Sequence, residues 1–136
     1  MRLMAVPRSA PASSSILIVD DDAGVTETFA RMLRLEGFRV RTAATAETAL
    51  LETQRVTPDA IILDLRMPVV DGLAFLHRLR ALADYRTIPV AIVTGDYFLD
   101  ERVCAELHRL GAAISLKPLW LEDLVALARS LVEVRH

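Results

Sequence analysis

Three unbroken apolar runs, at residues 16–19, 60–63 and 90–93, constrain the fold more than any other feature of the chain. Each run is short and is followed by a polar residue or a turn signal, which indicates a buried strand. An unbroken apolar run implies that both faces of the strand are covered, and such strands are typical of parallel sheets. The runs therefore predict a parallel sheet that is covered by helices on both sides.

Segments with a helical spacing of apolar residues separate the predicted strands. They are the segment from Val25 to Gly37 and residues 47–54, 72–82, 100–110 and 122–134. In the second of these helices we expect Ala49, Leu50 and Leu51 to face the core. Regular alternation of strand and helix along a chain is the pattern of the α/β class.

Two weaker strand signals complete the predicted sheet. Residues 38–42 alternate between apolar and polar side chains, which is typical of a strand at an edge, and residues 112–116 form a short, mainly apolar strand. Crossovers between parallel strands are right-handed, so few strand orders remain. With residues 38–42 placed outside the first strand, the prediction is a five-stranded parallel sheet in the flavodoxin-like order 2-1-3-4-5.

Composition predicts one domain and excludes several other classes of protein. The chain has 136 residues, of which 53% are hydrophobic, and we assign residues 1–15 to a flexible N-terminal tail and residues 16–136 to one domain. The net charge of −2 provides no large basic surface, so we expect no nucleic-acid partner. No apolar run is long enough to cross a membrane. The short N-terminal apolar stretch is not a secretory signal, so we expect a cytoplasmic location.

Polar residues stand where four of the predicted strands end. They are Asp20 and Asp21 after the first strand, Asp64 at the end of the third, Thr94 after the fourth and Lys117 after the fifth. The carboxyl ends of parallel strands lie at one edge of a sheet, where open α/β folds bind their ligands. We therefore expect these side chains to converge on one crevice. Each also has an ordinary explanation when taken alone, because an acid after the first strand can cap the next helix.

Three carboxylates in one crevice repel one another unless a cation or a proton is present. At a separation of about 4 Å and an effective dielectric constant of about 20, the repulsion is roughly 4 kcal/mol per pair. Ligands that are all oxygen atoms suit Mg²⁺. An aspartate can also form an aspartyl phosphate. Lys117, the only lysine among 16 basic residues, offers a compact charge that can neutralise a transferred phosphoryl group.

Over residues 16–134 the chain resembles the receiver domain of two-component response regulators. The residues that carry the resemblance are residues 16–22, residues 63–68 with Asp71 and Gly72, Val93 with Thr94, and Lys117 with Pro118. The resemblance implies that Asp64 is the phosphoacceptor and that Asp20 and Asp21 bind Mg²⁺ together with Asp64. It also implies that Thr94 is the switch hydroxyl and that Lys117 binds the phosphoryl group.

The resemblance further implies a signalling switch and not an enzyme, beyond catalysis of its own phosphorylation and dephosphorylation. We expect a stand-alone receiver, a monomer or weak homodimer, that is phosphorylated by a histidine kinase or a phosphotransfer protein. The signal would then pass to an unknown downstream protein through the face formed by the fourth helix, the fifth strand and the fifth helix.

One position departs from the family pattern. Many receivers carry Tyr or Phe three residues before the lysine, but this chain has Ile114 there. An aliphatic side chain cannot make the same movement with a polar tip, so we expect Tyr97 or Phe98 to replace the missing aromatic residue.

Two other functions are compatible with an α/β fold and an acidic crevice. A phosphatase of the haloacid-dehalogenase type also uses an aspartyl phosphate, but Arg66 stands two residues after Asp64, where that family has a general acid. A flavin-binding flavodoxin relative is disfavoured because the acids at residues 20–22 would repel the flavin phosphate.

Overall fold

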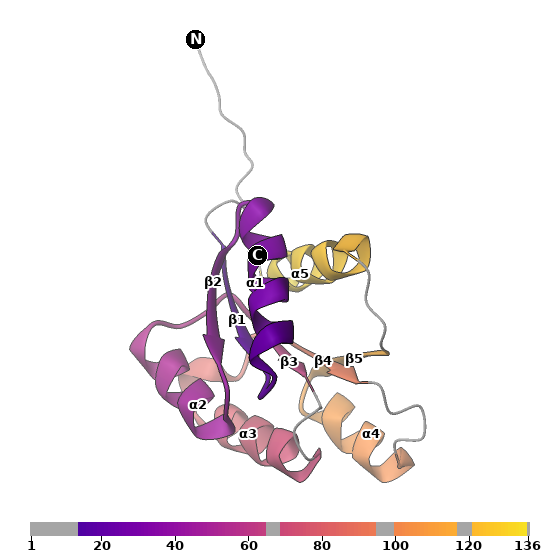
Figure 1. Ribbon diagram of the computed structural model, residues 1–136. Helices are drawn as coiled ribbons and strands as arrows, with labels where there is room; N and C mark the ends of the chain where they lie inside the picture. Colours follow the sequence, from indigo (N-terminus) through magenta and orange to yellow (C-terminus); the bar gives the residue numbers. More distant parts are fainter. Residues whose placement is uncertain (1–13, 65–68, 95–99, 117–120, 136) are drawn as a thin grey trace.

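The fold is a five-stranded parallel sheet between two layers of helices (Figure 1). The computed structural model describes residues 14–64, 69–94, 100–116 and 121–135. In chain order the elements are β1 (Ser15–Val19), α1 (Ala23–Leu35), β2 (Arg39–Ala43), α2 (Ala46–Arg55), β3 (Ala60–Asp64), α3 (Val69–Ala81), η2 (Ala83–Tyr85), β4 (Val90–Thr94), α4 (Glu101–Arg109), β5 (Ala112–Leu116) and α5 (Leu121–Arg135).

The strand order β2-β1-β3-β4-β5 confirms the predicted topology. All four strand pairs are parallel. β2 lies at an edge, as its alternating pattern predicted. Its burial does not alternate strictly, because Val40 and Ala43 are buried on opposite faces whereas Arg39 and Thr42 are exposed. The short 3-10 helix η2 was not predicted, since three residues are too few to show a periodicity.

Each face of the sheet has its own apolar core. On one face, strand side chains such as Leu17 and Ile61 pack against α2, α3 and α4, whose contributions include the fully buried Phe75 and Leu107. On the other face, α1 and α5 cover the sheet, and Ala128 of α5 is fully buried there. Because both faces are covered, every residue of β1 and β4 is buried, which explains their unbroken apolar runs.

Glycine correctly marked the ends of two helices, α1 and α4. Gly37 and Gly111, which follow α1 and α4, have positive φ angles of 98° and 80°. Glycine adopts this conformation without the steric cost of a Cβ atom, so it commonly follows the end of a helix. Thr45 caps α2, because its hydroxyl accepts a hydrogen bond from the Thr48 amide.

The inward face of α2 was predicted incorrectly at one position. Ala49 and Leu50 are buried, but Leu51 is 65% exposed. Thr53, four residues after Ala49, is fully buried instead and donates a hydrogen bond to the Ala49 carbonyl at 2.8 Å. Residues four apart share a helix face, whereas Leu51 is rotated away from it. Hydrophobicity alone therefore misplaced Leu51.

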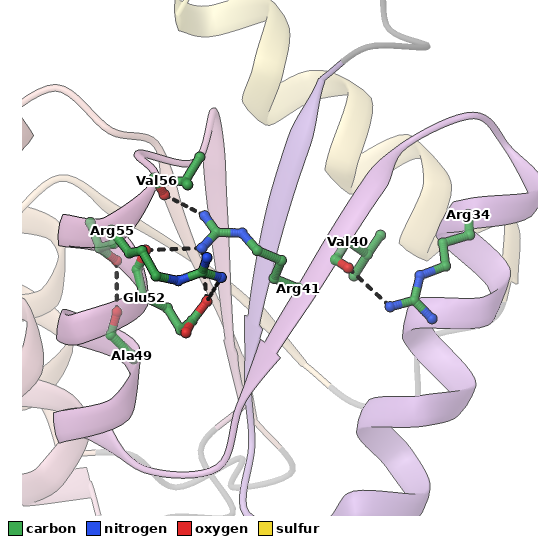
Figure 2. A network of polar contacts seen from close by, with 8 residues as sticks. Arg34, Val40, Arg41, Ala49, Glu52, Arg55 and Val56 are labelled. Carbon is green, nitrogen blue, oxygen red and sulfur yellow. Dashed lines mark hydrogen bonds and ion pairs between the residues drawn. The ribbon is translucent and has the colours of Figure 1, made fainter.

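Two arginines connect the edge strand β2 to the helices on either side of it (Figure 2). Arg41 donates from Nη1 to the Glu52 carbonyl and carboxylate, both at 2.9 Å, and from Nη2 to the Val56 carbonyl. The Glu52 carbonyl also accepts the Val56 amide at 3.1 Å, so Arg41 adds a second bond there and supplies a donor to the carbonyl of Val56, the C-cap of α2. Arg34 of α1 donates to the Val40 carbonyl at 3.0 Å. Arg34 thus occupies a backbone acceptor of the edge strand, which protects that edge from pairing.

Candidate functional site: the acidic edge of the sheet

The backbone register brings three of the predicted site residues to neighbouring positions at the carboxyl ends of the strands, which form the acidic edge of the sheet. Val19 pairs with Leu63, so Asp20 follows β1 at the level where Asp64 ends β3. Asp64 pairs with Val93, so Thr94 is one residue further along the adjacent strand. Neighbouring strands are about 4.8 Å apart. The predicted proximity of these positions is therefore present in the backbone, while the side chain of Asp64 lies outside the described part of the structure.

Asp20 is held in place by its surroundings. It is only 2% exposed, and its Oδ1 atom accepts a hydrogen bond of 2.9 Å from the Asp22 amide. Its own amide donates to the Ala43 carbonyl at 3.0 Å, which ties the end of β1 to the end of β2. A buried carboxylate is costly unless it has polar partners or a cation nearby. Its position at the carboxyl end of a central strand is that expected for a ligand-binding acid.

The three consecutive acids have different structural roles. The Oδ1 atom of Asp22 accepts hydrogen bonds from the amides of Gly24 and Val25 at 2.9 and 3.1 Å, so Asp22 is the N-cap of α1. Asp21 is exposed to solvent. The ordinary explanation therefore holds for one acid of the three, and Asp20 and Asp21 need another reason for their presence.

Thr26 also supports this loop, and the sequence analysis did not identify it. Its hydroxyl donates to the Asp22 carbonyl at 2.8 Å and lies 3.4 Å from the Asp20 carbonyl oxygen. The side chain is 6% exposed. A threonine four residues after an N-cap, facing back toward the preceding turn, is the signal that could have indicated it.

A cavity of about 190 Å³ opens beside these acids, between the start of α1 and the end of β2. Its acidic lining residues are Asp20, Asp21 and Glu27. Hard oxygen ligands of this kind suit Mg²⁺, which usually keeps several of its waters and takes only one or two carboxylates from a protein. Within the described residues, no three acids, histidines or cysteines are close enough together to form a metal site. The donor set available from β1 is thus chemically suited to Mg²⁺ but supplies only part of a coordination shell.

Thr94 lies at the carboxyl end of β4, whereas Ile114 lies in the middle of the neighbouring strand β5. Thr94 is 1% exposed at the end of β4 and pairs with Leu116 in the sheet register. Ile114 pairs with Ile92 and packs, partly buried, against the core beneath α2, α3 and α4. Lys117, and both candidates for the replacement aromatic residue, Tyr97 and Phe98, lie outside the described residues.

A model of the family described as the response regulator receiver domain matches residues 16–129. This chain belongs to the response regulator receiver family. The predicted family is thereby confirmed, and it is a family of signalling switches in two-component systems, not of classical enzymes.

Known proteins similar to this receiver domain agree with the assignment. The transcriptional regulatory protein PrrA of Mycobacterium leprae is 38% identical over 91% of this chain and 52% of its own length. The response regulator MprA of the same organism is 38% identical over 86% of this chain and 50% of its own length. The receiver therefore spans about half the length of the curated relatives that it matches.

Solved structures support the same fold. The chemotaxis protein CheY4 of Vibrio cholerae superposes with a TM-score of 0.78 at 28% identity, covering 88% of this chain and 98% of that one. A putative response regulator from Chloroflexus aurantiacus gives a TM-score of 0.77 at 31% identity, covering 89% and 98%. In the part of the receiver that the structure describes, no helix has the length and hydropathy needed to cross a bilayer.

Proposed function

We propose that this receiver accepts a phosphoryl group on Asp64. The observation that carries the proposal is the strand register, which sets Asp64 between the buried Asp20 after β1 and the buried Thr94 at the end of β4. In the reaction, a carboxylate oxygen of Asp64 forms a bond to phosphorus. The bond from phosphorus to the donor breaks, and the donor leaves with the electron pair.

The neighbouring residues are proposed to balance the charge of the transferred group. Asp20 and Asp21, with Asp64, would hold Mg²⁺, which supplies positive charge next to the phosphoryl oxygens when it is bound. The Thr94 hydroxyl would donate a hydrogen bond to a phosphoryl oxygen, and the Lys117 ammonium group would neutralise another. Phosphoryl transfer depends mainly on positioning and charge stabilisation, so these roles suffice without a general base.

The proposed donor is a phosphohistidine on a histidine kinase or on a phosphotransfer protein. The proposed output is a changed protein-binding surface formed by α4, β5 and α5. The stand-alone action of the receiver stays a prediction. The same is true of the absence of a nucleic-acid partner, because a longer relative, of which this chain covers 52%, is named a transcriptional regulatory protein.

The capping role of Asp22 gives no support to the phosphatase alternative. Phosphatases of that type carry Asp-x-Asp after the first strand, a spacing that Asp20 and Asp22 share, so Asp22 would have to be the general acid. The Asp22 carboxylate is instead engaged by two amides at the start of α1, at 2.9 and 3.1 Å. A carboxylate that is held by two amides at the start of a helix has a structural role as a cap.

Incubation with Mg²⁺ and acetyl phosphate tests the proposal by intact-mass measurement. We expect the wild-type chain to gain one phosphate, and Asp64→Asn and chelator-treated wild type to gain none. Asp84→Asn is the matched control, because Asp84 is an exposed acid in η2 and should leave phosphorylation unchanged. Borohydride reduction of the phosphorylated chain, followed by peptide mapping, should assign the modification to residue 64. A phosphate gained by Asp64→Asn would overturn the assignment.

A further inference from the structure

An open groove lies between α2 and α3. These two helices are on the sheet face opposite α1 and α5 (Figure 1). It consists of two adjoining cavities of about 490 and 380 Å³. Glu47 of α2 and Arg78 of α3 line both cavities, so the two form one continuous depression. The groove has no part in the phosphorylation site proposed above.

The groove is apolar at its base and along part of its rim. Phe75 and Leu50 are 0% and 6% exposed and belong to the core beneath it. Leu51 and Leu82 stand at the rim with 65% and 37% of their surface exposed. They are two of the four large hydrophobic side chains that are exposed in the described part of the chain. Exposed apolar side chains that gather around a groove mark an interaction site more often than scattered ones do.

The charged side chains that line the groove differ in ion pairing from other charged side chains on α2. Glu52 and Arg55 of α2 form an ion pair of 2.9 Å with each other. By contrast, no hydrogen bond or ion pair joins the side chain of Glu47 or Arg78 to any other described residue. Glu47 has a local benefit in the first turn of α2, where a negative charge is favourable. Arg78 likewise lies in the last turn of α3, where a positive charge is favourable. Among the described residues, each of the two side chains keeps its charge free for a partner of opposite charge on another molecule.

We propose that the groove is the interface of a homodimer in which a second copy of this chain packs with two-fold symmetry. A two-fold interface requires a self-complementary surface, so that each contact occurs twice. One acid and one base on the rim of the same groove meet this requirement. Glu47 of each copy pairs with Arg78 of the other, and the exposed Leu51 of each copy enters the apolar groove of its partner. A partner with a single sign of charge would leave one of the two side chains without a complement.

Charge reversal provides a test that depends on this symmetry. Sedimentation velocity of the unphosphorylated full-length chain over a concentration series should show reversible dimerisation. Glu47→Arg and Arg78→Glu should each weaken it by about tenfold or more, because like charges then face each other twice. An equimolar mixture of the two single variants should form heterodimers, and the double variant should dimerise again, because opposite charges are restored in both cases.

Controls separate a lost interface from a lost fold. Arg31→Glu reverses an exposed charge on α1, away from the groove, and should leave dimerisation at the wild-type level. Circular dichroism of each variant checks that the helices are retained. A wild-type chain that is monomeric at all concentrations would overturn the proposal, and so would a mixture of the single variants that remains monomeric. If the groove binds a different protein instead, the wild-type chain should be monomeric at all concentrations.

Discussion

The side chains of Glu106 on α4 and His77 on α3 are in polar contact, with 2.8 Å between the Glu106 Oε2 and His77 Nε2 atoms. Arg109, one turn later on α4, donates to the same carboxylate from two of its nitrogens. A second link joins the same helices, because Arg80 of α3 donates to the Leu110 carbonyl at the end of α4 at 2.8 Å. The position of α4 beside α3 therefore rests on polar contacts as well as on the buried Leu107.

The Glu106 contacts predict a pH dependence of stability. The hydrogen bond from Arg109, the charge of Arg109 and the contact with His77 hold the pKa of Glu106 below its ordinary value of 4.5. A carboxyl group whose pKa is lower in the folded state stabilises the fold above its unfolded pKa, and that contribution is lost as the pH falls through the folded pKa. Glu106→Gln should therefore be less stable than wild type near neutral pH, and the difference should shrink in acid.

Urea unfolding of wild type and Glu106→Gln measures this effect. The difference between the two midpoints should be largest above the ordinary glutamate pKa of 4.5 and should shrink as the pH falls below it. Glu133→Gln removes an exposed acid near the end of α5 and serves as the control. A midpoint difference that is independent of pH would contradict the role given to Glu106.

Removal of the α1 cap should destabilise the receiver. Asp22→Ala leaves the Gly24 and Val25 amides without their side-chain acceptor, at an expected cost of about 1 kcal/mol in the free energy of unfolding. Asp22→Ser keeps an oxygen acceptor at the cap and should recover most of that loss. Chemical denaturation of both variants checks the prediction, which fails if the two are equally destabilised.

Truncation of Arg41 should loosen α2 from the edge strand. Arg41→Ala removes two hydrogen bonds to backbone carbonyls, those of Glu52 and Val56, each with a net contribution of about 0.5–1.5 kcal/mol. Thr42→Ala, an exposed position on the same strand, is a useful comparison and should cost less. Hydrogen exchange should show faster exchange in the last turn of α2 for Arg41→Ala. Unchanged protection there would argue against a bracing role.

Relief of repulsion among the proposed metal ligands should stabilise the metal-free protein. In chelator, Asp21→Asn and Asp64→Asn should each raise the melting temperature, because each removes one charge from the acidic edge of the sheet. With excess Mg²⁺ the advantage should disappear, since the wild type then gains stability from binding. Melting temperatures at or below the wild-type value in chelator would show that the carboxylates are too far apart to repel appreciably.

The sequence alone determined the fold class, the strand order and the chain positions of the acids. Unbroken apolar runs can be buried only between two helical layers, and the alternating run at residues 38–42 belongs at an edge. These patterns reflect local burial along the chain, so they can be recognised in the sequence without coordinates. The prediction failed at Leu51, where Thr53 is buried instead, because hydrophobicity does not reveal which side of a short helix faces the sheet.

Only the tertiary structure decided which of the neighbouring acids is buried, which is exposed and which caps a helix. Residues 20–22 are identical in type, yet Asp20 is buried, Asp21 is exposed and Asp22 caps α1. That division follows from the tie between the Asp20 amide and the Ala43 carbonyl of β2, a contact between segments far apart in the chain. The groove between α2 and α3 has the same origin, because the side chains that line it come from two helices that pack together only in the folded state.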